Sequence, residues 1–161
     1  MISPPITGFL QKTARSTDCS DLGTMRVDPK AFEHITGPII ESAIEVHRQL
    51  GPGLLESAYS PCVHYELTAR KLRFQVQRSV PLIYKGLSLD TSYRLDLVVE
   101  DTIVVEAKSV VEVLPVHRSQ LLTYLRLVDC PVGLIINFNV PLLVDGVKRV
   151  LNPAARLKSA L

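Results

Sequence analysis

The sequence has few cysteines, and their placement argues against two kinds of small stabilised protein. Cys19, Cys62 and Cys130 are widely spaced and form neither a CxxC pair nor a Cys/His metal-binding pattern. The sequence therefore indicates neither a disulfide framework nor a structural metal, and it fits a reducing compartment.

Long hydrophobic runs are also absent. No apolar run approaches the roughly 18 residues that a membrane-spanning helix needs. The first twelve residues, MISPPITGFLQK, lack the basic stretch and long apolar core of a signal peptide. We therefore expect a cytoplasmic protein with no membrane partner.

An excess of charge of either sign is missing as well. Eighteen basic and sixteen acidic residues leave a net charge of +2, so any nucleic-acid binding must depend on a local basic patch. With 161 residues, of which 47% are hydrophobic, the chain is long enough for a single sizeable core. We expect residues 1–30 to be a poorly ordered leader and residues 31–161 to form one domain.

The hydrophobic pattern predicts an α/β fold in which helices flank a mixed central sheet. In the second helix, Pro61 should cause a kink or make Ser60 a new N-cap. The expected helices are residues 38–50, about 54–71 and a third from Pro115, and the expected strands are 74–84, 87–99, 103–110, 132–138 and an edge strand at 148–151.

Four charged residues interrupt two strands that otherwise consist of core residues. The segment YRLDLVVEDTIVVEAKS, residues 93–109, contains Arg94, Asp96, Glu106 and Lys108 among leucine, valine and isoleucine. A two-residue turn between the strands would mix charged and apolar side chains on both faces. A three-residue turn at 100–102 places Asp96 opposite Glu106 and Arg94 opposite Lys108, which the hydrophobic pattern favours.

The three-residue turn separates the two faces of the hairpin. One face then carries only Leu95, Leu97, Val99, Ile103, Val105 and Ala107. On the other face, opposed Asp96 and Glu106 would repel each other unless one is protonated or a cation lies between them. Such oxygen ligands suit Mg²⁺ or Mn²⁺, and a divalent ion beside a lysine is equipped for phosphodiester hydrolysis. The alternative is a solvated sheet face where Asp96 pairs with Arg94 and Glu106 with Lys108.

Three motifs together resemble one nuclease superfamily. Asp96 followed by Glu106-Ala107-Lys108 resembles the D…ExK core of the PD-(D/E)XK nucleases, and QLLTY at 120–124 resembles the QxxxY helix motif of some members. GLLESAY at 53–59 fits the signature of the GxxExxY family within that superfamily. The resemblance covers roughly residues 35–152 and implies a restriction-endonuclease-like core.

The resemblance also implies a role for each residue of the site. Asp96, Glu106 and the Ala107 carbonyl would be metal ligands, with Mg²⁺ or Mn²⁺ as the cofactor. The residues implied or suggested for catalysis are Lys108, Glu56, Gln120 and Tyr124, and those for substrate binding are Arg94 and Arg118. Glu56 could instead be an ordinary first-turn glutamate, and Gln120 and Tyr124 could simply pack beside the leucines of their helix.

Three functions fit the sequence. The first is a Mg²⁺-dependent nuclease that acts on DNA or RNA. The second is a nucleic-acid-binding or protein-binding module that retains the nuclease fold without catalysis. The third is an enzyme that uses the same carboxylates on a small phosphorylated substrate. Nucleic acid is the expected partner, and the edge strand at 148–151 offers one route to a homodimer.

Overall fold

The computed structural model describes residues 27–155, apart from the side chains of residues 90 and 91. Most of the expected leader, residues 1–26, therefore lies outside the described residues. Residues 27–30 do not extend away from the domain. Val27 is buried in the core, and a short 3₁₀ helix, η1, covers Pro29–Phe32. The packed domain thus includes the last four residues assigned to the leader.

A five-stranded mixed sheet forms the centre of the fold, in the order β1-β2-β3-β4-β5. Neighbouring strands are antiparallel except β3 and β4, which are parallel and joined through α3. This confirms the predicted α/β architecture and places β5 at an edge. The elements are α1 (Glu33–Leu50), α2 (Glu56–Ala69), β1 (Phe74–Tyr84), β2 (Leu87–Val99), β3 (Ile103–Lys108), α3 (Pro115–Val128), β4 (Val132–Asn137), α4 (Leu143–Gly146) and β5 (Val147–Leu151).

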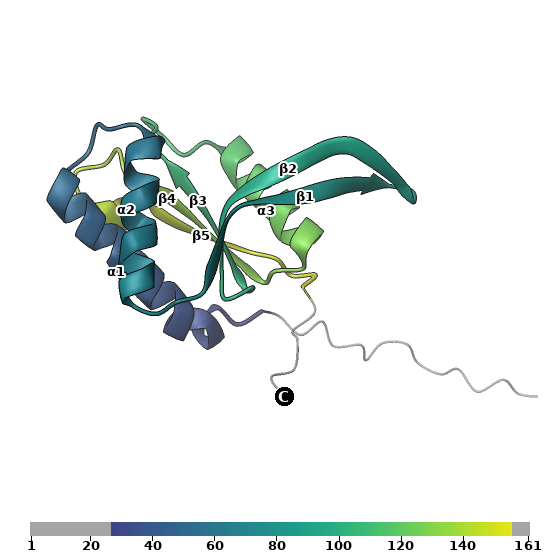
Figure 1. Ribbon diagram of the computed structural model, residues 1–161, viewed down its shortest axis with the longest axis horizontal. Coiled ribbons are helices and arrows are strands. Elements are labelled where there is room, and N and C mark those ends of the chain that lie inside the picture. Colours follow the sequence, from purple (N-terminus) through teal and green to yellow (C-terminus); the bar gives the residue numbers. More distant parts are fainter. Residues whose placement is uncertain (1–26, 156–161) are drawn as a thin grey trace, which may run out of the picture.

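Helices cover both faces of the sheet. Helices α1 and α2 lie on one face and α3 lies on the other (Figure 1). Ile39 of α1 and Val63 of α2 pack against one face of β3 and β4, whereas Leu121 of α3 packs against the opposite face. Gly133 of β4 allows this close approach of α3, because a Cβ atom there would lie 2.8 Å from side-chain atoms of Leu121. Among the described residues, no helix is long and apolar enough to cross a membrane.

Helices α1 and α2 each run through an internal proline. Helix α1 starts earlier than the sequence predicts, and α2 is not interrupted at its proline. Helix α1 begins at Glu33, five residues before Pro38. Helix α2 runs through Pro61, so Ser60 is not an N-cap; its hydroxyl donates a hydrogen bond to the Glu56 carbonyl (3.0 Å). Each proline is the sixth residue of its helix, where it removes one intrahelical hydrogen bond, and both helices nevertheless continue past it.

The register between β2 and β3 confirms the three-residue turn. Leu97 pairs with Val105, and Val99 pairs with Ile103. The pairing ends at Leu97, however, so Arg94 does not oppose Lys108. Arg94 instead lies opposite Ser79 of β1, because β2 follows β1 away from β3 beyond this point.

This separation of β2 from β3 overturns one expected face assignment. Leu95 was expected beside Leu97, but it packs with Val98 and Val104 under α3, whereas Leu97 packs on the face covered by α1 and α2. Strict alternation of side chains fails here, since Gln77 on the neighbouring β1 has a φ of +52° and lies between two regularly paired residues.

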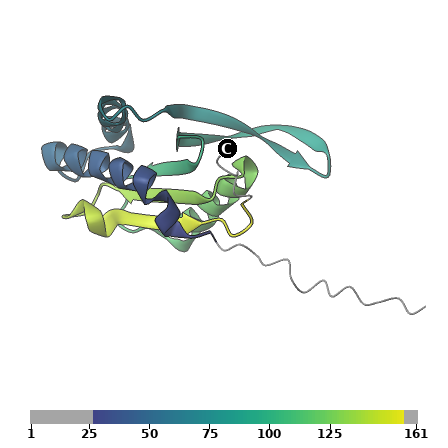
Figure 2. The ribbon, with the colours of Figure 1, turned by 90° about the horizontal axis from the view of Figure 1, so that it is seen from below.

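The paired strands β1 and β2 continue beyond the rest of the sheet as an antiparallel hairpin, which we call the arm (Figure 2). Its root is fixed against α3. Val80 is buried there, and the ring of Tyr93 lies 5.6 Å from the ring of Tyr124 on α3. The arm thus leaves the domain directly beside the residues expected to form the site.

Candidate active site

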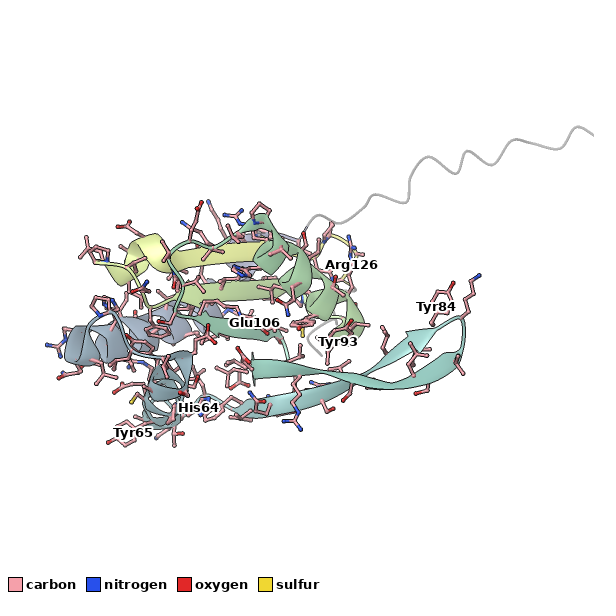
Figure 3. The ribbon with its side chains drawn as sticks, turned by 90° about the horizontal axis from the view of Figure 1, so that it is seen from above. His64, Tyr65, Tyr84, Tyr93, Glu106 and Arg126 are labelled. Carbon is pink, nitrogen blue, oxygen red and sulfur yellow. The ribbon has the colours of Figure 1, made fainter. Side chains whose placement is uncertain are left out.

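Asp96 and Glu106 meet where β2 separates from β3, a place we call the fork. Asp96 is the first residue of β2 beyond the paired segment, and Glu106 is the next residue of β3. Glu106 is only 5% exposed, and Asp96 is half-buried. Figure 3 shows Glu106 on the sheet, between the helices and the arm. The two side chains are close enough that the charge of Asp96 raises the pKa of Glu106. Two carboxylates this close repel each other unless one is protonated or a cation lies between them.

The fork perturbs both acids in the same direction. Burial, followed by repulsion from Asp96, raises the pKa of Glu106 to about 7, against an opposing effect of Lys108. Burial also raises the pKa of Asp96, although the Lys108 charge and the neighbouring Glu106 and Ala107 oppose this rise. Glu106 is therefore only partly ionised near neutral pH, and a cation could replace its proton.

One oxygen of Glu106 is left without a donor. Among the described residues, Oε1 of Glu106 is the only buried side-chain oxygen or nitrogen with no hydrogen-bond partner when the acids are ionised. The other oxygen, Oε2, lies 3.5 Å from Nζ of Lys108. An unsatisfied buried carboxylate oxygen is costly, so this oxygen favours either a shared proton or a cation.

The backbone of Ala107 also faces the fork. Its N–H lies near the Asp96 carboxylate and lowers the pKa of that acid. The N–H and C=O of one strand residue point to the same side, so the Ala107 carbonyl is directed toward the fork as well. Consistent with this alternation, the Lys108 carbonyl points the other way and accepts a bond from the N–H of Phe138 beyond β4 (2.8 Å).

These groups fit a hard divalent cation. The fork offers two carboxylates and a backbone carbonyl, which are the oxygen ligands that Mg²⁺ and Mn²⁺ prefer. Within residues 27–155, no three acidic, histidine or cysteine side chains form a ready-made metal cluster. A cation at the fork would therefore have to take its remaining ligands from the backbone, water or substrate.

Glu56 is brought to the end of β3 by the N-terminus of α2. Its Oε1 accepts a hydrogen bond from the N–H of Ser109 (3.1 Å), the residue that follows Lys108. The Ser109 hydroxyl donates to the carbonyl of Leu54, which ties the two loops together. A groove of about 340 Å³ opens here between Leu55, Glu56, Ser57 and Ser109. Glu56 thus faces solvent beside the fork instead of lying on a remote helix surface.

Tyr59 positions the loop that carries Glu56. Its ring is fully buried and stacks on Phe138, with ring centroids 4.3 Å apart. Its hydroxyl donates to the Gly51 carbonyl (2.7 Å) and accepts from the N–H of Leu54 (3.1 Å). The tyrosine therefore fixes the entry to α2, and Gly53 provides the turn with a φ of +96°.

Helix α3 brings Tyr124 close to the fork from the opposite side. Tyr124 is 5% exposed, and its hydroxyl accepts a hydrogen bond from Nε2 of Gln120 (2.6 Å). Burial raises the pKa of Tyr124, the bond from Gln120 lowers it, and the charges of Glu106 and Lys108 are near enough to contribute. Gln120 itself is exposed.

Comparison with protein families matches residues 33–150 to the PD-(D/E)XK nuclease superfamily. The chain belongs to this superfamily. The match extends from the start of α1 into β5 and so includes the fork, the Glu56 loop and the Gln120–Tyr124 pair. Searches of curated proteins and of solved structures found no match.

Two basic residues expected to bind substrate lie apart from the other site residues of this PD-(D/E)XK domain. Arg94 is exposed on the arm, two residues from Asp96, and no ion pair joins them within residues 27–155. Arg118 is exposed on α3. Its position is about 200° around the helix from Gln120, so the two side chains leave α3 on different sides. The alternative interpretation, a solvated face with two salt bridges, is therefore wrong for Asp96 and Arg94 among the described residues, whereas Lys108 does pair with Glu106.

Sequence reasoning missed Asn137, which supports the PD-(D/E)XK site from β4. Its side chain is buried, accepts a hydrogen bond from the N–H of Val110 (3.0 Å) and donates one to the Val110 carbonyl (2.9 Å). The amide thereby fixes the backbone just after Lys108. A signal was present, because Asn137 is the only polar side chain in the buried segment VGLIINF.

Proposed function

We propose that this PD-(D/E)XK domain is a nuclease that hydrolyses phosphodiester bonds of DNA or RNA with Mg²⁺ or Mn²⁺ at the fork. The observation that carries the proposal is the buried Oε1 of Glu106, which lacks a donor and lies beside a second carboxylate and a lysine. A purely structural sheet would gain stability from apolar residues at these positions. The arrangement therefore supports a binding and catalytic role.

Each residue of the chain then has a distinct task. Asp96, Glu106 and the Ala107 carbonyl hold the cation, which supplies Lewis acidity toward the phosphate when it is bound. The Lys108 ammonium, held near Glu106, stabilises negative charge that develops on the phosphate oxygens. Glu56 accepts a hydrogen bond from the N–H of Ser109 in the groove and is placed to orient a water molecule or receive its proton.

The remaining residues of the site act by positioning the metal ligands, Lys108 and Glu56. Tyr124, whose hydroxyl accepts the hydrogen bond from Gln120, lies near Glu106 and Lys108 and is placed to orient their side chains from the α3 side of the fork. We assign the domain to the GxxExxY branch of the superfamily, because Gly53, Glu56 and Tyr59 perform separable tasks there: the glycine makes the turn, the tyrosine fixes the loop, and the glutamate reaches the groove.

A catalytically silent binding module is the second candidate. The observation in its favour is that the described residues contain no group of three acidic, histidine or cysteine side chains ready for a metal. The two functions can be distinguished by whether a divalent ion causes cleavage of the bound nucleic acid. A nuclease cleaves it only in the presence of a divalent ion, whereas a binding module leaves it intact.

The test measures hydrolysis of bis(p-nitrophenyl) phosphate and of labelled DNA and RNA with Mg²⁺, Mn²⁺ or EDTA. The nuclease proposal requires metal-dependent cleavage that falls by about 100-fold or more in Glu106→Gln and Lys108→Met. Glu112→Gln, which changes an exposed glutamate outside the fork, is the matched control and should retain full activity. Binding of nucleic acid without any metal-dependent cleavage would establish the silent module instead.

A further inference from the structure

The arm has a solvent face with no role in the packing of the domain. The opposed residues Val80 and Tyr93 face α3, so their neighbours along the strands, Ser79 and Arg94, face the other way. Ser79 and Arg94 are themselves directly opposed and both exposed, as are Pro81 and Ser92 further along. We call these four residues the outer face of the arm.

The chemistry of the outer face suits nucleic acid. These four residues combine an arginine with two serine hydroxyls and a proline, and none of the four is acidic. Arginine and serine donate hydrogen bonds to base edges and phosphates, whereas an acidic side chain on the same face would repel the phosphates. Near the root, Arg78 faces α3 and pairs with Asp101 (3.7 Å), so its charge is partly neutralised and it belongs to the opposite face.

The shape of the arm favours duplex DNA. The major groove of B-form DNA is about 12 Å wide and admits a two-stranded β-ribbon, whereas the major groove of A-form RNA is too narrow for side chains to read. Between Gln77, level with Asp96, and Tyr84 at the turn, β1 extends about 23 Å at 3.3 Å per residue. That reach is roughly two-thirds of one turn of duplex.

Single-stranded nucleic acid fits this face less well. Single-strand binding surfaces use a series of aromatic side chains on which successive bases stack. The outer face has no aromatic residue, and Tyr93 is turned toward Tyr124. Tyr84 is exposed, but it lies alone at the tip, far from Glu106 and Tyr93 (Figure 3).

We propose that the arm lies in the major groove of duplex DNA, with its outer face toward the bases, and that it delivers the duplex to the fork. This proposal rests on the proposed nuclease function, because it names duplex DNA as the substrate that the fork would cleave. The arm and the fork share strand β2, in which Arg94 and Asp96 are two residues apart. DNA held by the arm is thereby placed beside the carboxylates.

The main variant shortens the arm and leaves both the fork and the four outer-face residues unchanged, so it tests the reach of the arm, whereas a point variant tests the outer face itself. Residues 82–91 are replaced by Asn-Gly, a two-residue sequence that favours a tight hairpin turn after the paired Pro81 and Ser92. The replaced segment contains one lysine and one aspartate, so the net charge of the chain is unaltered. Any loss of DNA binding therefore cannot be attributed to total charge.

The probes are a labelled 24-base-pair DNA duplex, one of its strands, and the corresponding RNA duplex, each titrated in EDTA and followed by fluorescence anisotropy. We expect full-length protein to bind the DNA duplex about tenfold or more tightly than either other probe. The shortened arm should weaken duplex binding by about tenfold or more. Equal affinity for all three probes, tighter binding of the single strand or the RNA duplex, or no loss on shortening would overturn the proposal.

A point variant tests the outer face without shortening the arm, so the proposal can be tested even if the shortened protein misfolds. Ser79→Glu places a negative charge on the exposed outer face, and Ser119→Glu makes the same change at an exposed site on α3. We expect Ser79→Glu to weaken duplex binding by about tenfold and Ser119→Glu to weaken it by less than about twofold. Equal effects of the two variants would overturn the assignment.

Hydrolysis of bis(p-nitrophenyl) phosphate separates this proposal from the nuclease proposal. The substrate has no duplex, so the shortened arm should hydrolyse it at the full-length rate in Mn²⁺. If neither protein hydrolyses it, the nuclease function fails while arm-dependent DNA binding still stands. If shortening changes a dimer into a monomer on gel filtration without changing DNA affinity, the arm binds a second copy and the DNA proposal is overturned.

Discussion

Asp96 and Glu106 lie close together at the point where β2 turns away from β3 to follow β1, and the charge of Asp96 raises the pKa of Glu106. The relationship depends on the strands separating there. Had the pairing continued, Arg94 would oppose Lys108 and the acids would lie on an ordinary sheet face. The separation instead buries Glu106 and leaves one of its oxygens without a donor.

The stability of the protein should fall as pH rises through neutrality. Glu106 has a pKa of about 7 in the fold against an ordinary 4.5, so the folded state binds more protons than the unfolded state between these values. The contribution of this group is fully present below pH 4.5 and is lost as pH rises through about 7.

Urea unfolding between pH 5 and 8.5 tests this dependence. We expect the wild type to lose on the order of 2 kcal/mol over that range from this acid, at about 1.4 kcal/mol per pKa unit. Glu106→Gln should remove most of the slope and be more stable than wild type at pH 8. The exposed control Glu112→Gln should keep it. A wild-type slope that survives in Glu106→Gln would show that other groups cause it.

Mg²⁺ should raise the thermal unfolding temperature more at pH 8 than at pH 5.5. A cation that binds the folded state stabilises it, and protons compete with it for Glu106 and Asp96. Differential scanning fluorimetry over a Mg²⁺ series at both pH values measures the difference. The same shift in an Asp96→Asn/Glu106→Gln variant would mean that the ion binds elsewhere.

Tyr59→Phe should destabilise the fold by about 1–3 kcal/mol, because it leaves the Gly51 carbonyl and the Leu54 N–H without their buried partner. The stacking on Phe138 is retained, so the variant isolates the hydroxyl. Tyr65→Phe is the matched control, since Tyr65 is 74% exposed. Equal stability of the two variants in urea would refute the role given to the Tyr59 hydroxyl.

Two glycine substitutions should have opposite effects. Gly133→Ala inserts a methyl group 2.8 Å from Leu121 and should cost about 1–3 kcal/mol as α3 is pushed outward. Gly37→Ala meets nothing within 4 Å inside α1 and should stabilise by about 0.5–1 kcal/mol. Chemical denaturation gives the free energy of unfolding of both variants. A destabilised Gly37→Ala or a neutral Gly133→Ala would contradict this packing.

Much of the central sheet could be predicted because its pattern is local. Alternating apolar residues determine the bounds of β1 and β2, and the need to keep charges off the core face selects the register of Leu97 with Val105. The separation of the strands could not be predicted in this way. It depends on β2 having two competing partners, and β1 prevails beyond Leu97.

The residues of the site also differ in how far the local sequence predicts their proximity. The acids and Lys108 are close in sequence once the hairpin is recognised, so spacing alone suggests their proximity. Glu56 and Tyr124 come from separate helices on opposite faces of the sheet, and only their resemblance to motifs indicated that they might approach the fork. Pro61 was misleading, since α2 continues through it even though a proline there removes one intrahelical hydrogen bond.

Isothermal titration of Mn²⁺ into the wild type and into Asp96→Asn/Glu106→Gln at pH 8 tests the central claim most directly. The two substitutions keep the shape of each side chain and remove only its charge. We predict saturable binding to the wild type and none to the variant. Identical titrations of the two proteins, whether both bind or neither does, would contradict a metal site at the fork.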